Sequence, residues 1–66
     1  MTDYTTTEIT SLIREYVHNE RNREILKRRL IDGRTYEQLA EEFDLSPRQV
    51  KNIVYKEEKI LFSKLH

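Results

Sequence analysis

Residues 35–55 read TYEQLAEEFDLSPRQVKNIVY, and this stretch is the most specific indication of the fold. Apolar residues recur at helical spacing in both of its halves, which predicts two helices joined by a tight turn. The second helix has a well-marked start, because Ser46 is a capping residue type, Pro47 suits the first helical position and Gln49 completes a capping box. No helix-breaking residue follows, so we expect this helix to continue to about Leu65.

The first helix of this stretch begins by the same logic. Thr35 and Gln38 have the spacing of a capping box, and Asp44 and Leu45 form the turn that ends the helix. Asp44 stands where a glycine is common, and aspartate tolerates the left-handed backbone conformation of such a turn. Its buried side should consist of Tyr36, Leu39, Ala40 and Phe43.

Two further helices are predicted upstream. Thr5 and Glu8 form a capping box for the first, and its apolar pattern lapses over residues 18–22. A second helix is expected over residues 22–32, since Gly33 follows at a position where helices commonly stop. The apolar residues of the two helices are Ile9, Leu12, Ile13, Tyr16 and Val17, then Ile25, Leu26, Leu30 and Ile31.

The composition agrees with an all-α domain of four helices. The 66 residues include one glycine and one proline, and the helix-favouring residues Glu, Lys, Arg, Leu and Ile are abundant. A chain of this length forms one domain. We therefore expect a single domain over residues 1–66, in which an amphipathic helix within 1–21 precedes a compact unit over 22–66.

Several classes of function find no support in the sequence. There is no cysteine, and His18 and His66 lie far apart without further ligands, so neither a metal site nor a cofactor is expected. No nucleophile–base pair or phosphate-binding glycine loop is recognisable, which argues against an enzyme. Without a membrane-spanning apolar run or a signal-peptide pattern, we expect a cytoplasmic protein.

The net charge is zero, but the charges are segregated along the chain. Residues 1–19 carry −2, residues 20–34 carry +3, residues 35–45 carry −4 and residues 46–66 carry +3. A partner can therefore meet a strongly basic or a strongly acidic part of the surface.

The last predicted helix has one apolar and one basic face. On a helical wheel of about 100° per residue, the apolar side chains gather within roughly 80° of Val50. These core candidates are Val50, Ile53, Val54, Ile60, Leu61 and Leu65. The opposite arc contains no acid and consists of Arg48, Gln49, Asn52, Lys56, Lys59 and Ser63.

Such a face suits the major groove of double-stranded DNA. The guanidinium of Arg48 matches the two acceptors of guanine, and the amide of Asn52 can bond adenine bidentately. The amide of Gln49 can do the same, but its place in the capping box competes with that role. Phosphate contacts are expected from Lys51, Lys56 and Lys59. The alternative is an ordinary solvated helix face.

A second basic cluster precedes the two helices. Arg28 and Arg34, with Lys27 and Arg29 beside them, can clamp DNA phosphates or form a solvated surface whose stems are buried. The acidic third helix would repel DNA if it faced it, and it offers a docking face for a basic partner instead.

The motifs from Arg23 to Leu65 resemble region four of bacterial sigma factors, a helix-turn-helix domain that reads the upstream promoter element. The resemblance rests on a basic-apolar helix, the Gly-x-Thr entry at Gly33, an acidic helix with the small residue Ala40, a Ser-capped reader and a Lys-rich tail. Pro47 departs from the basic or polar residue often found there in that family.

The resemblance implies sequence-specific binding of double-stranded DNA in transcription regulation, as in small phage or mobile-element regulators. It implies that Arg48, Gln49 and Asn52 face bases, with Lys51 and Lys56 near the backbone. The alternative is a protein-interaction module that binds RNA polymerase or a phage protein without touching DNA.

Tyr55 and Phe62 lie seven residues apart, off the apolar arc of the last helix. We expect the first helix to cover them. The alternative is a homodimer contact, which fits two half-sites about one DNA turn apart.

Overall fold

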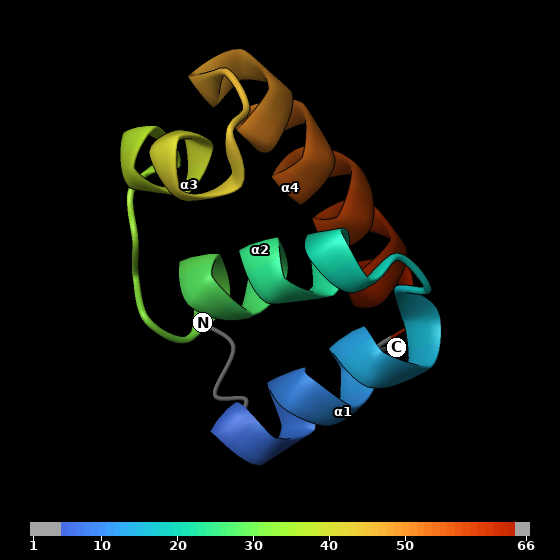
Figure 1. The fold of residues 1–66 in the computed structure, drawn as a ribbon. Helices are drawn as coiled ribbons and strands as arrows, with labels where there is room; N and C mark the ends of the chain where they lie inside the picture. The colour runs from blue at the N-terminus through green and yellow to red at the C-terminus, as the bar shows by residue number, and fades with distance from the viewer. Residues whose placement is uncertain (1–4, 65–66) are drawn as a thin grey trace.

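The computed structural model describes residues 5–64, which form four helices and no strand. They are α1 (Thr6–Tyr16), α2 (Glu20–Leu30), α3 (Tyr36–Phe43) and α4 (Pro47–Ser63). Helix α4 packs against the other three, and α1 and α3 lie on opposite sides of α2 (Figure 1). The all-α, four-helix prediction is confirmed.

Reciprocal capping boxes fix the starts of three helices. They join Thr5 with Glu8, Thr35 with Gln38 and Ser46 with Gln49. In each box the hydroxyl accepts the backbone N–H three residues on, and the side chain there accepts the N–H of the capping residue, at 2.9–3.1 Å. These starts are the ones the sequence predicts.

Helix α2 differs from its predicted span at both ends. It begins at Glu20 rather than residue 22, because the side chain of Asn19 accepts the N–H of Asn22 at 3.1 Å and caps the helix earlier. It ends at Leu30 instead of reaching residue 32, and Gly33 then turns the chain at a φ of 70°.

The turn between α3 and α4 is closed by Asp44. This residue adopts the left-handed conformation with φ 57° and ψ 48°, as expected from its side chain. The N–H of Leu45 then donates to the carbonyl of Ala40 at 2.8 Å, which satisfies a carbonyl at the end of α3. The turn therefore directs the chain into Ser46 and the start of α4.

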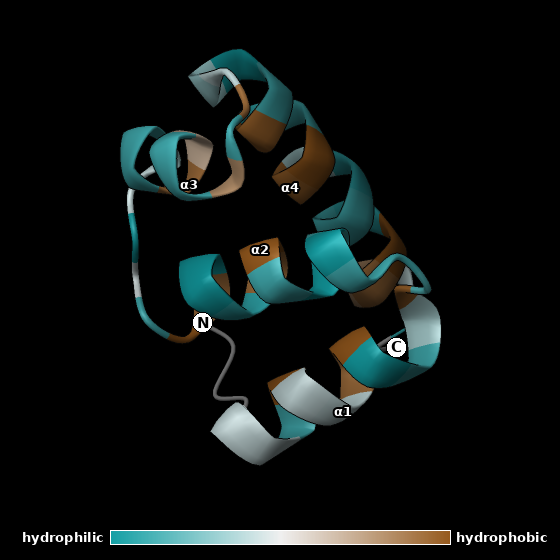
Figure 2. Ribbon diagram, in the orientation of Figure 1, coloured by the Kyte–Doolittle hydropathy of each residue, from teal (hydrophilic) through white to brown (hydrophobic). Residues whose placement is uncertain are grey.

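The core lies where the apolar faces of the helices meet (Figure 2). Its buried members are Ile13, Val17, Ile25, Leu26, Leu39, Ala40, Val50, Val54 and Leu61. Ile53 and Ile60 are only partly buried, because they occupy the edge of the apolar arc of α4. The predicted core position Leu65 lies outside the described residues. No helix within residues 5–64 is long and apolar enough to cross a membrane.

Side-chain hydrogen bonds of Arg23 and Asn22 join α2 to α1 and to α4. The guanidinium of Arg23 donates to the carbonyl of Val17, and its Nη2 donates to that of Arg14 at 2.8 Å, which satisfies the carboxyl end of α1. The amide of Asn22 donates to the buried carboxylate of Glu57 on α4 at 2.9 Å. Both contacts hold α2 in place beneath α4.

Candidate nucleic-acid interface

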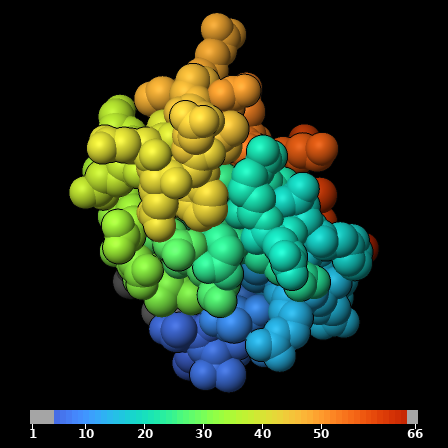
Figure 3. Space-filling model, in the orientation of Figure 1, coloured from blue at the N-terminus to red at the C-terminus, as the bar shows by residue number. Residues whose placement is uncertain are grey.

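Helix α4 presents the predicted basic and amide residues to solvent. Arg48, Asn52, Lys56 and Lys59 are all exposed, whereas the opposite side of the helix is buried in the core. The first turns of α4 project from the end of the molecule that lies away from α1 (Figure 3). This part of the helix is therefore free to approach a ligand.

The basic residues of α4 make no ion pair with any other residue of the described chain. The two acids of the helix lie elsewhere, since Glu57 is buried against Asn22 and Glu58 is half-buried. Burial raises the pKa of the Glu58 carboxyl, and the nearby guanidinium of Arg29 opposes that rise. Among the described residues, no carboxylate pairs with the basic side chains of the exposed face, so this face favours an anionic ligand.

Gln49 is exposed, but its side chain is already in use. Its Oε1 accepts the N–H of Ser46 at 2.9 Å in the capping box. A bidentate contact with adenine needs both the amide nitrogen and this oxygen. While the box is intact, this oxygen is already engaged, so the capping role competes with a bidentate contact and leaves the amide nitrogen as the freer of the two groups.

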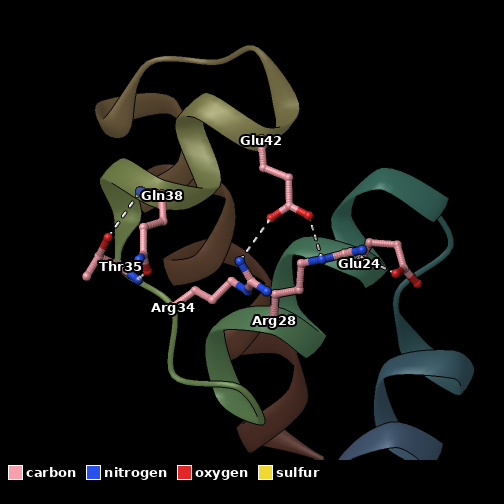
Figure 4. A network of polar contacts seen from close by, with 6 residues as sticks. All are labelled: Glu24, Arg28, Arg34, Thr35, Gln38 and Glu42. Atoms are coloured by element: carbon pink, nitrogen blue, oxygen red, sulfur yellow. Dashed lines mark hydrogen bonds and ion pairs between the residues drawn. The ribbon is translucent and has the colours of Figure 1, made fainter.

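The second basic cluster is tied to acidic side chains (Figure 4). Arg28 lies 2.8 Å from Glu24 within α2 and 2.8 Å from Glu42 on α3, and its guanidinium lies over the ring of Phe43. Arg34 reaches the other oxygen of Glu42 at 4.0 Å. We call this contact between α2 and α3 the seam. It engages Arg28 and Arg34 within the protein itself.

Tyr55 and Phe62 are not covered by α1, so that prediction is wrong. Their side chains are 54% and 43% exposed. They lie beside the core-facing side of α4, and α1 packs against that side. Tyr55 instead contacts Tyr36 of α3 in an edge-to-face arrangement, with ring centroids 6.5 Å apart. Sequence reasoning missed Tyr36 as a neighbour, because only the crossing of α3 and α4 brings the rings together.

Two hollows lie away from α4. A hollow of about 340 Å³ lies between α1 and α2, and another of about 290 Å³ lies along α3. No residue of α4 lines either of them. Residues 5–64 also contain no cluster of His, Cys, Asp and Glu able to hold a metal ion.

Comparison with known proteins assigns the family. Residues 19–56, more than half of the chain, match the model of the family described as Sigma-70, region 4. The chain belongs to the sigma-70 region 4 family. No curated protein and no solved structure matches significantly.

A sigma-70 region 4 domain is a non-catalytic DNA-binding domain that acts in transcription, and it binds RNA polymerase as well as DNA. The match begins at Asn19, the N-cap of α2, and ends within α4. It therefore covers the seam, the turn and the exposed start of α4, while α1 lies outside it.

Proposed function

We propose that this protein binds specific DNA sequences in transcription regulation by inserting the N-terminal half of α4 into the major groove. The observation that carries the proposal is the exposed, acid-free face of α4 in a chain of the sigma-70 region 4 family. A helix of this kind fits the major groove, where phosphates on both sides attract cations. The site of action is then the cytoplasm, and a small phage or mobile-element regulator would use the unit in this way.

The side chains divide into those that read bases and those that hold the backbone. Arg48 pairs with guanine and Asn52 with adenine, while Gln49 donates one hydrogen bond from its amide nitrogen. Phosphates are contacted by Lys51, Lys56 and Lys59. Arg28 and Arg34 can add phosphate contacts where DNA replaces the carboxylate of Glu42 as their partner.

The proposal is tested by fluorescence-anisotropy titration with a mixed-sequence duplex at low and near-physiological salt. Binding should weaken steeply as salt rises, because each phosphate contact releases counterions. Selection from random duplexes then identifies the preferred site. Absence of binding even at low salt would overturn groove insertion.

A second candidate function is a protein-interaction module that docks on RNA polymerase or another protein without direct DNA contact. The exposed aromatic side chains of Tyr55 and Phe62 favour it, because large apolar groups on a surface mark interaction sites. Exposed Glu37 and Glu41 on α3 offer a further face for a basic partner. Salt separates groove insertion from docking through Tyr55 and Phe62, since an apolar protein contact is insensitive to ionic strength. Docking through Glu37 and Glu41 would also weaken with salt, and it is recognised by the absence of DNA binding at low salt.

The same two aromatic residues are the predicted homodimer contact. Sedimentation of the protein without DNA tests that prediction directly, because a dimer through Tyr55 and Phe62 would form without a nucleic-acid template.

A further inference from the structure

Four side chains from three helices form a continuous row, which we call the flank row. The guanidinium of Arg29 on α2 lies 4.3 Å from the ring centroid of Tyr36 on α3. The Tyr36 ring meets the ring of Tyr55 on α4 at 6.5 Å and an angle of 77°. The ammonium of Lys51 lies 5.4 Å from the Tyr55 centroid. The row thus consists of two adjoining aromatic rings with a cation at each end.

The flank row borders the face of α4 that we propose reads bases. On the helical wheel Tyr55 is about 20° from Arg48 and about 60° from Asn52. Tyr36 is the first residue of α3, so the row runs from the edge of the reading face to the amino end of that helix. With α4 in the groove, this flank faces the sugar–phosphate strand that forms the groove wall.

Tyr55 is exposed to solvent, but neighbouring side chains hold its ring in place. Its side chain is 54% exposed, although aromatic rings supply much of the buried surface of small domains. The Tyr55 ring nevertheless has two neighbours, because it makes an edge contact with Tyr36 and lies beneath the ammonium of Lys51. A side chain that is already ordered loses little conformational entropy when it binds, so the row is preorganised for a ligand.

We propose that the flank row is a second DNA-contact site, which binds phosphates of the strand next to the base-reading face. The hydroxyls of Tyr55 and Tyr36 donate hydrogen bonds to phosphate oxygens, and Lys51 supplies the charge. This inference rests on the proposed function, because it requires α4 to lie in the groove. It adds Tyr36 and Tyr55 to the DNA-binding residues.

Arg29 is a positioning residue in this row. Its Nη1 donates to the carbonyl of Arg34 at 2.8 Å, and its guanidinium also faces the half-buried Glu58. These contacts hold it inside the protein, where its planar group stacks on Tyr36. It therefore orients the Tyr36 ring rather than reaching the DNA.

Electrostatics oppose the main alternative for Tyr55, a contact with a second copy of the chain. An antiparallel two-fold pair of α4 helices that stacks Tyr55 on Phe62 has its axis between residues 58 and 59. On one side of that axis Glu58 meets the Glu58 of the second copy, and on the other Lys59 meets its Lys59. Both contacts place like charges next to each other, which disfavours this dimer.

The experiment compares Tyr55→Ala with Phe62→Ala, because both residues are exposed aromatics on the same edge of α4. Duplex affinity is measured by fluorescence anisotropy, and circular dichroism verifies that each variant is folded. Tyr55→Ala should weaken binding about tenfold, since a hydrogen bond to a charged group is lost. Phe62→Ala should leave the affinity unchanged.

The hydroxyl and the charge of the row are separated by two further variants. Tyr55→Phe keeps the ring and should still weaken binding, with no change in the slope of log affinity against log salt. Lys51→Ala should reduce that slope by about 0.9, the value for one phosphate contact. A photocrosslinking residue, p-benzoylphenylalanine, should attach to DNA from position 55 and not from position 62.

Equal affinities for Tyr55→Ala and Phe62→Ala would overturn the inference while leaving groove insertion intact. Crosslinking of position 55 to a second protein chain would overturn it in favour of a dimer. Failure of the unmodified protein to bind DNA at low salt would remove the proposed function and this inference together.

Discussion

The basic side chains of the seam and those of α4 have contrasting surroundings. At the seam, Arg28 and Arg34 share the carboxylate of Glu42, and Arg28 also pairs with Glu24. The basic residues of α4 have no carboxylate partner within residues 5–64. The same residue types therefore serve two purposes, since the first group holds α2 against α3 and the second is available for a ligand.

The largest expected effect comes from removing a cation of α4. Arg48→Ala should cost about 1–3 kcal/mol of binding free energy on the selected duplex and relax the preference at one base position. Its unfolding free energy should stay unchanged, because the side chain is exposed and makes no ion pair in the described structure.

Anisotropy and urea titrations measure the two quantities for Arg48→Ala. Arg14→Ala is the matched control, as it removes an exposed arginine from α1 at the other end of the molecule. Equal losses of DNA affinity in the two variants would contradict the proposed orientation.

Removing a cation of the seam should act on stability instead. Arg28→Ala deletes two ion pairs and the contact with the Phe43 ring, which together should cost about 1 kcal/mol of unfolding free energy. Urea denaturation measures this loss. An unchanged unfolding midpoint would show that the seam does not hold α2 against α3.

Glu42→Gln removes the carboxylate that Arg28 and Arg34 share at the seam. If the freed Arg28 and Arg34 reach phosphates, binding at low salt should tighten about two- to threefold, the scale of one exposed ion pair. Glu41→Gln controls for the change in net charge, because Glu41 is an exposed acid of the same helix that makes no ion pair in the described structure.

Equal affinities for Glu42→Gln and Glu41→Gln would confine Arg28 and Arg34 to a structural role. Anisotropy titration on the same duplex provides the measurement.

The smallest effect concerns Glu58, whose carboxyl lies near Arg29 of the flank row. Burial raises its pKa above the ordinary 4.5, so the folded protein binds this proton more strongly than the unfolded chain. Ionisation of the Glu58 carboxyl therefore destabilises the folded protein. This effect is absent below pH 4.5 and grows as the pH rises through the raised pKa of Glu58. Glu58→Gln should therefore match the unmodified protein near pH 3 and be slightly more stable at neutral pH.

Thermal unfolding of the Glu58 variant at the two pH values gives the comparison. A variant that is less stable at neutral pH would mean that the attraction of Arg29 outweighs the cost of burial.

Features encoded over three or four residues were predictable from the sequence. The capping boxes and the left-handed Asp44 gave the helix starts and the turn correctly, and the wheel of α4 separated its buried and exposed sides. The early start of α2 was missed, although Asn19 is a recognisable capping residue type.

Contacts that depend on helix crossing angles were not predictable. Arg28 and Glu42 lie 14 residues apart, and their ion pair exists only because α2 and α3 meet at a particular angle. The pairing of Tyr36 with Tyr55, 19 residues apart, likewise depends on the crossing of α3 and α4. Periodicity assigns a residue to a face of a helix, but it does not say which side chain of another helix it will meet.

The capping boxes also have a consequence for how the chain folds. Each box closes between residues only three positions apart, so it forms without waiting for distant parts of the chain. The helices most closely packed, α3 and α4, are also neighbours in sequence. Small helical domains dominated by local contacts fold in microseconds to milliseconds. This arrangement assigns the domain to that fast class, with helix starts that the capping boxes favour locally and helices that become stable when they dock.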